Sequence, residues 1–131
     1  KYPSINPSRE CRDVMDERRR YREMILENIE YEIIATPFNK KQIDEMVEIM
    51  LDAVCSSKDT IRINGENMPK EIVKSRFLKL RSSHIEYVFD AMKSNPSDIR
   101  NIRSYLLTTL YNASLTMDSY YTAFVNHDLY G

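Results

Sequence analysis

The residue types that carry out catalysis or bind metals do not form a recognisable constellation in this sequence. The two histidines, His84 and His127, lie far apart, and neither has cysteines near it at the spacing of a zinc site. We expect His84 to be exposed in the first turn of a helix. Cys11 and Cys55 are single, and we expect Cys55 to be a buried thiol at the apolar end of a helix. Because Gly65 stands alone, the chain has no glycine-rich phosphate loop, and we expect no enzyme activity, metal, cofactor or small-molecule substrate.

Basic side chains are concentrated in one stretch, although the whole chain has 19 basic and 20 acidic residues and a net charge of −1. Residues 60–81 contain six Lys or Arg and only two Asp or Glu. Lys70, Lys74 and Arg81 share one face if a single helix spans them. Such a stripe can neutralise the phosphates of a nucleic acid. The alternative is an ordinary solvated helix face.

The run Arg18–Arg20 also has the composition of a nucleic-acid patch. Asp16 and Glu23, however, lie one helical turn from arginines of this run, and the spacing predicts ion pairs within one helix. A row of carboxylates follows on the next helix, and we expect it to form a solvated face: Asp44, Glu48 and Asp52.

Apolar side chains recur at helical spacing along most of the chain, so we expect helices to position these residues. We expect a first helix over residues 9–34, capped by Ser8 and with a break at Asn28. Asn39 is expected to cap the second helix, which has the clearest apolar stripe of the chain: Ile43, Met46, Val47, Met50, Leu51 and Val54.

The middle of the chain predicts a short hairpin followed by further helices. Thr60–Ile63 alternates polar and apolar residues and precedes Asn64-Gly65, which favours a type I′ turn. Pro69 suits the first turn of a third helix. Three more helix starts are indicated by capping residues: Ser83 (with Glu86 completing a capping box), Ser97 and Thr116.

The expected fold is all-α, a compact bundle of about six helices with a small β-hairpin or extended excursion near residues 60–68. Two glycines in 131 residues argue against a β-sandwich or barrel. The length fits one domain, and we expect residues 1–8 to be the remnant of a linker and residues 9–131 to be one helical domain of a longer protein. No apolar run reaches the ~18 residues of a membrane span and no signal peptide opens the chain, so we expect a cytoplasmic protein.

Seven short segments between residues 20 and 131 resemble the C-terminal domain of the replication initiator protein A family. They are Glu27–Ile34, Ala53–Cys55, Thr60–Gly65, Val73–Leu80, Ser83–Val88, Ile99–Leu107 and Tyr120–Gly131. These initiators belong to plasmids and conjugative elements of Gram-positive gut bacteria, and their C-terminal domain is similar to the helical domain of the primosomal protein DnaD. The resemblance implies a DnaD-like fold and a non-catalytic module that engages host replication proteins, such as primase, helicase loader or helicase.

DnaD-like domains carry a Tyr-x-x-x-Ile-x-x-Asn motif, which this chain matches in part. Tyr105 and Asn112 occupy its ends, Thr109 stands where Ile is expected, and Leu110 comes one place late. The resemblance implies that Tyr105, Thr109 and Asn112 take part in binding. From the residues alone, the alternative is that Tyr105 packs on the core and Asn112 caps the end of its helix.

Two other functions remain open. In the first, the domain binds single- or double-stranded DNA, Tyr105 stacks on a base, and six basic residues contact phosphates: Lys70, Lys74, Lys79, Arg81, Arg100 and Arg103. The near-neutral total charge does not favour strong DNA binding. In the second, Met-rich and Tyr-rich helices pair with another copy of the chain to form a homo-oligomer.

Overall fold

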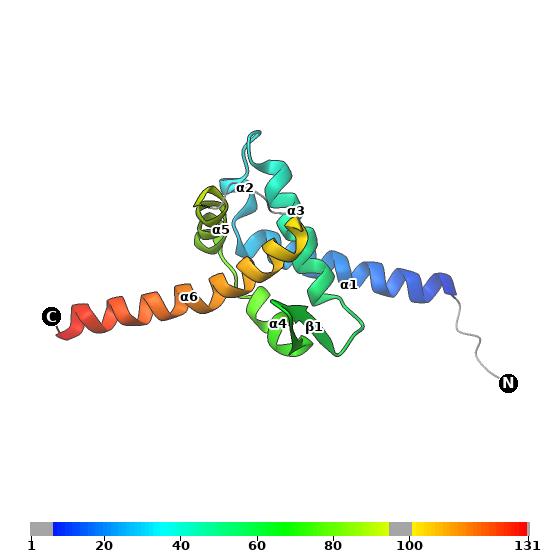
Figure 1. Cartoon of the computed structure of the whole chain (residues 1–131). Helices are drawn as coiled ribbons and strands as arrows, with labels where there is room; N and C mark the ends of the chain where they lie inside the picture. The colour runs from blue at the N-terminus through cyan, green and yellow to red at the C-terminus, as the bar shows by residue number, and fades with distance from the viewer. Residues whose placement is uncertain (1–6, 95–100, 131) are drawn as a thin grey trace.

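The computed structural model describes residues 7–94 and 101–130, with side chains described at 14–93 and 101–116. Within these residues a helical bundle and a two-stranded hairpin confirm the expected fold class. Figure 1 shows a central body from which the first helix and the end of the last helix project in opposite directions. The elements in chain order are α1 (Pro7–Asn28), α2 (Tyr31–Ile34), α3 (Lys40–Val54), β1 (Thr60–Ile63), β2 (Glu66–Pro69), α4 (Lys70–Phe77), α5 (Ser82–Ser94) and α6 (Ile102–Tyr130).

A short break separates α1 from α2, as the sequence predicts at Asn28. Glu30 adopts the left-handed conformation, with φ 56° and ψ 50°, and Nδ2 of Asn28 donates a hydrogen bond of 2.8 Å to the carbonyl oxygen of Leu78. The prediction that Ser8 caps this helix is wrong. The helix already begins at Pro7, because a proline suits the first helical position.

The centre of the core is α3, which packs against α1, α4 and α6. Its predicted apolar stripe is confirmed, since every residue of the stripe is buried. Asn39 precedes the helix as expected, but its side chain does not cap it. Its Oδ1 instead accepts a hydrogen bond of 2.7 Å from the backbone N–H of Thr36. Other helices add buried residues around α3: Ile25, Ile29, Val73, Phe77, Ile85, Val88, Leu106 and Leu110.

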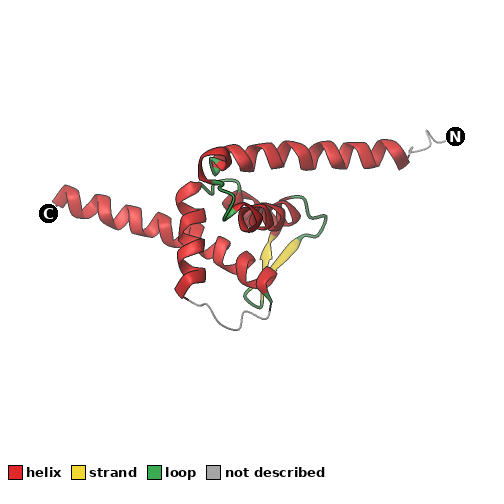
Figure 2. Cartoon of the chain, turned by 90° about the horizontal axis from the view of Figure 1, so that it is seen from above, coloured by secondary structure: helices red, strands yellow, loops and turns green. Residues whose placement is uncertain are grey.

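The hairpin formed by β1 and β2 is antiparallel, with Thr60 opposite Pro69 and Ile63 opposite Glu66. Asn64 and Gly65 both have positive φ, 53° and 82°. Positive φ at both central residues defines a type I′ turn and favours glycine at the second, so the turn prediction is confirmed. In Figure 2 the hairpin lies on one side of the body, where it packs against α4 and α6.

The third predicted helix is shorter than its charge pattern suggested. Because α4 ends at Phe77 and α5 begins at Ser82, Arg81 lies between the two helices. Lys70 and Lys74 are on α4, so the predicted single stripe of Lys70, Lys74 and Arg81 is wrong. The carbonyl oxygen of Leu78, just past the end of α4, is occupied by the side chain of Asn28 described above.

The start of α5 is organised by a histidine instead of the predicted Ser83 cap. The backbone N–H of Arg81 donates a hydrogen bond of 2.9 Å to Nδ1 of His84. The imidazole thus takes the place that Glu or Gln has in a capping box. Because His84 is only 8% exposed, the expectation of an exposed histidine is wrong.

The last helix, α6, is continuous, whereas the sequence pattern predicted two helices that meet at Thr116. No Gly or Pro interrupts residues 102–130, and an isolated threonine does not end a helix. The Oδ1 of Asn101 caps its first turn by accepting a hydrogen bond of 3.0 Å from the backbone N–H of Ser104. The predicted cap Ser97 lies outside the described residues. Neither α6 nor another helix of the described chain is both long and apolar enough to cross a membrane.

Candidate functional site

The basic residues predicted to form one binding face are distributed over several elements. Lys79 is exposed in the turn between α4 and α5, and Arg81 is exposed at the start of α5. Lys74 contacts another helix, since its Nζ lies 4.8 Å from the ring centroid of Tyr21 on α1. A hydrogen bond with Tyr21 raises the pKa of Lys74. Arg100 lies outside the described residues.

Of the three carboxylates of α3 predicted to form a solvated face, Asp44 is exposed, whereas Glu48 and Asp52 bind neighbouring helices. Arg18 of α1 donates hydrogen bonds of 2.7 Å to Glu48 and 2.9 Å to Asp52. Arg22 adds a bond of 2.5 Å to Glu48. On the other side Arg103 of α6, a predicted binding residue, pairs with Asp52. These five residues, which we call the α3 ion-pair seam, join α1, α3 and α6.

The seam changes the protonation of its carboxyl groups. The hydrogen bond from Arg22 is the largest cause that lowers the pKa of Glu48, and Arg18 adds to it. Burial acts to raise the pKa of Asp52, but the hydrogen bonds from Arg103 and Arg18 outweigh it, so that this pKa is also lowered. Both groups therefore stay ionised to a lower pH than free carboxyl groups.

The arginine run of α1 does not form the ion pairs within one helix that the sequence predicted. Arg18 faces α3, whereas Arg19 and Arg20 are exposed. Neither of the predicted pairs, Arg20 with Asp16 or Arg19 with Glu23, is an ion pair in the described part of the chain. Arg19 and Arg20 are thus available cations on a helix that projects from the body.

The partial Tyr-x-x-x-Ile-x-x-Asn motif lies on one face of α6. Tyr105 is half-buried and packs against the core, and the hydroxyl of Thr109 donates a hydrogen bond of 2.7 Å to the carbonyl oxygen of Tyr105. Asn112 is exposed in the middle of α6, so the alternative that it caps a helix end is wrong. Of the three residues, only Asn112 is exposed.

A cleft of about 390 Å³ lies between the end of α3, the hairpin and the first turns of α6. Lys58, Arg62 and Arg103 contribute three cations to its lining, Asp52 contributes one anion that pairs with Arg103, and Asn67 adds an amide. Lys58 and Arg62 are exposed and form no ion pair with described residues. The sequence indicated no role for Lys58 and Asn67, because only the fold brings the loop before β1 and strand β2 to one cleft. The apolar part of the lining consists of Ile49, Ala53, Ile61 and Leu107.

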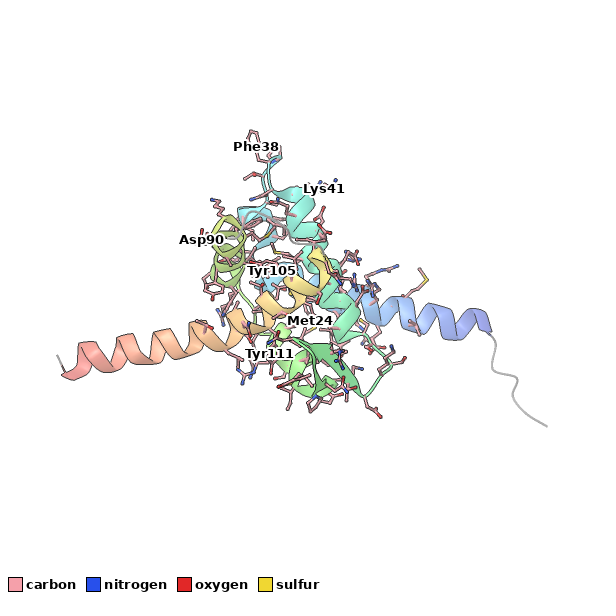
Figure 3. All side chains as sticks on the ribbon, in the orientation of Figure 1. Met24, Phe38, Lys41, Asp90, Tyr105 and Tyr111 are labelled. Carbon is pink, nitrogen blue, oxygen red and sulfur yellow. The ribbon has the colours of Figure 1, made fainter. Side chains whose placement is uncertain are left out.

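The loop between α2 and α3 presents an aromatic side chain on a fixed backbone. Phe38 is 97% exposed, and Figure 3 shows it at the tip of the loop, pointing away from the body. The hydroxyl oxygen of Thr36 accepts hydrogen bonds of 3.3 Å from the N–H groups of Phe38 and Asn39. Nδ2 of Asn39 donates one of 3.0 Å to the carbonyl oxygen of Ile34. No sequence motif indicated this loop beyond the Asn39 cap signal.

A second open depression, of about 510 Å³, follows the C-terminal half of α1 and α2. Leu26, Tyr31 and Ile33 supply its apolar lining, and Ile33 is 75% exposed. We call this depression the α1–α2 groove. Four exposed glutamates surround it, none in an ion pair with described residues: Glu23, Glu27, Glu30 and Glu32.

Metal and thiol chemistry have little support in the geometry. Among the side chains that the structure describes, no three His, Cys, Asp or Glu residues gather closely enough to hold a metal ion. Cys55 follows the last residue of α3 and is half-buried, not fully buried as predicted. Burial raises the pKa of its thiol, so the reactive thiolate is disfavoured.

The comparisons with known proteins give a family without an assigned function. No curated protein and no solved structure matches the chain. One family model, described as a family of unknown function, matches residues 2–131. The chain therefore belongs to the family DUF6017.

Proposed function

We propose that this domain is a non-catalytic module of a replication initiator from a plasmid or other mobile element, and that it recruits a host replication protein. The segments that resemble the C-terminal domain of the replication initiator protein A family support this identity. The partner is primase, helicase loader or helicase. In this proposal the protein acts in the cytoplasm, where these partners work.

The observation that carries recruitment is the loop with Phe38. An aromatic side chain that is 97% exposed gains a large apolar contact when a partner covers it, and aromatic residues dominate the energetics of many interfaces. The hydrogen bonds of Thr36 and Asn39 fix the loop before binding, so little ordering is needed on association.

The test measures binding of the 131-residue chain to purified primase, helicase and helicase loader of a Gram-positive host. We expect one of them to bind, and Phe38→Ala to weaken that binding by roughly 30-fold, the size of a hot-spot loss. Ile72→Ala is the matched control, since Ile72 is an exposed apolar residue of α4 at 44%. Unchanged binding of Phe38→Ala would exclude the loop as the anchor. Failure of all three proteins to bind would exclude recruitment.

DNA binding is the second candidate, and the cleft beside the hairpin favours it. Lys58 and Arg62 are cations without ion-pair partners among the described residues, next to an apolar lining that suits a base. The charge reversals Lys58→Glu and Arg62→Glu test it in titrations against single- and double-stranded DNA at two salt concentrations. We expect salt-sensitive binding whose salt slope falls by roughly one for each lost cation. Lys41→Glu, an exposed lysine of α3 away from the cleft, is the control. Absence of binding at low salt would exclude this candidate.

A further inference from the structure

The two halves of α1 have different surroundings. Ile25 and Ile29 in the C-terminal half are buried in the core. The N-terminal half leaves the body, as Figures 1 and 2 show from two directions. Val14 and Met15 there are 62% and 64% exposed. A helix that projects without packing is marginal in water, so this half needs a cover.

One face of α1 indicates the kind of partner that would cover this half of the helix. Met15, Arg19, Glu23 and Leu26 are spaced at i, i+4, i+8 and i+11, which places them on the same side of the helix. A cation comes first along this face and an anion second. Arg19 and Glu23 are exposed and pair with no described residue. Such a face is complementary to itself when a copy of it runs in the opposite direction.

We infer that α1 pairs antiparallel with α1 of a second copy of the chain, across a two-fold axis near Tyr21. Residues on either side of the axis then face each other in reciprocal pairs. Arg19 lies opposite Glu23 of the second copy, and Glu23 lies opposite Arg19 of the second copy. Met15 lies beside Leu26 of the second copy. Each contact is made twice.

The α1–α2 groove fits this arrangement. It begins at Glu23 and extends to Ile33, and it is the place where the projecting half of the second copy's α1 comes to lie. In this arrangement the apolar lining of the groove covers Met15 of the second copy, and Glu23 attracts Arg19 of the second copy. This surface is separate from Phe38, so the inference does not depend on the proposed recruitment.

The pairing is tested with charge reversals in sedimentation equilibrium over a wide range of concentrations. The wild-type chain is expected to form a dimer, weak because a single helix pair is smaller than a standard interface of ~1,600 Å². Arg19→Glu places a glutamate opposite Glu23 of the second copy, and Glu23→Arg places an arginine opposite Arg19 of the second copy. Because like charges then repel each other, each variant alone is expected to be monomeric. An equimolar mixture of the two variants is expected to form a heterodimer, and the double variant R19E/E23R to regain the homodimer.

Glu17→Arg is the matched control, because Glu17 is exposed on the other side of the same helix; it is expected to leave the dimer intact. Circular dichroism of each variant checks that the helices persist. A wild-type chain that stays monomeric at every concentration would overturn the inference. So would a dimer that survives both single reversals, since the contact would then use another face.

Discussion

The two long sides of α3 differ in how they hold the protein together. One side carries apolar residues that are all buried, such as Met50 and Leu51. The other side carries Glu48 and Asp52, which bind arginines of α1 and α6 but remain 45% and 40% exposed. Burial of apolar side chains gives most of the stability of a small domain, whereas exposed ion pairs give little. The seam therefore acts mainly to set how α1 and α6 are placed on α3.

Met50→Ala, on the apolar side of α3, is expected to reduce the stability of the protein most. Met50 is fully buried, and truncation of a buried methionine leaves a cavity that costs ~2–5 kcal/mol in the free energy of unfolding. Urea denaturation followed by circular dichroism measures the loss. Glu45→Ala on the exposed side of the same helix is expected to change stability by less than ~0.5 kcal/mol. Equal effects of the two substitutions would contradict the difference between the two sides.

The contribution of Glu48 and Asp52 to stability is expected to fall on acidification. The pKa values of Glu48 and Asp52 are lowered in the folded protein from ordinary values of 4.5 and 3.8. A lowered folded pKa means that the stabilisation is fully present above these ordinary values and is lost as the pH falls through the folded pKa values. Thermal unfolding of the wild type and of the double variant Glu48→Gln/Asp52→Asn between pH 7 and acid measures it. The double variant is expected to lose less stability on acidification.

A single substitution in the seam has a smaller effect. Asp52→Asn removes the charge that pairs with both Arg18 and Arg103, and both arginines can then be solvated, so the expected cost is about 1 kcal/mol. The cost is expected to shrink at high salt, because salt screens exposed charges. A cost that is the same at low and high salt would indicate that Asp52 acts through packing and not through charge.

Periodicity predicted the elements better than it predicted their ends and contacts. The stripe from Ile43 to Val54 and the Asn64-Gly65 turn depend on local spacing, and both were confirmed. The continuity of α6 was missed because a capping residue such as Thr116 favours a helix start without requiring one. The early end of α4 at Phe77 was missed because the carbonyl oxygen just beyond it is bound by Asn28, fifty residues away.

The candidate sites were harder to predict, because charge–charge contacts depend on which helices meet. A sequence shows that Arg18 and Asp52 carry opposite charges, but only the fold brings α1 to α3. The same holds for Lys58 and Arg62, which the hairpin places on one cleft with Arg103. Phe38 gave no signal because its exposure follows from hydrogen bonds within its loop. His84 was misjudged because a capping imidazole looks like any polar residue in a first turn.

The smallest expected effect concerns Lys74, which joins α4 to α1 through a ring in place of a carboxylate. Its Nζ lies 4.8 Å from the ring centroid of Tyr21, and a cation over an aromatic ring at a partly exposed site contributes about 0.5 kcal/mol. Lys74→Met keeps most of the aliphatic chain and removes the cation, so the loss in the free energy of unfolding isolates the charge. Tyr21→Phe keeps the ring face and removes only the hydroxyl. If the contact is a cation–ring contact, Lys74→Met costs more than Tyr21→Phe. If the hydrogen bond to the Tyr21 hydroxyl dominates instead, the two substitutions cost the same, and the double variant costs no more than either one.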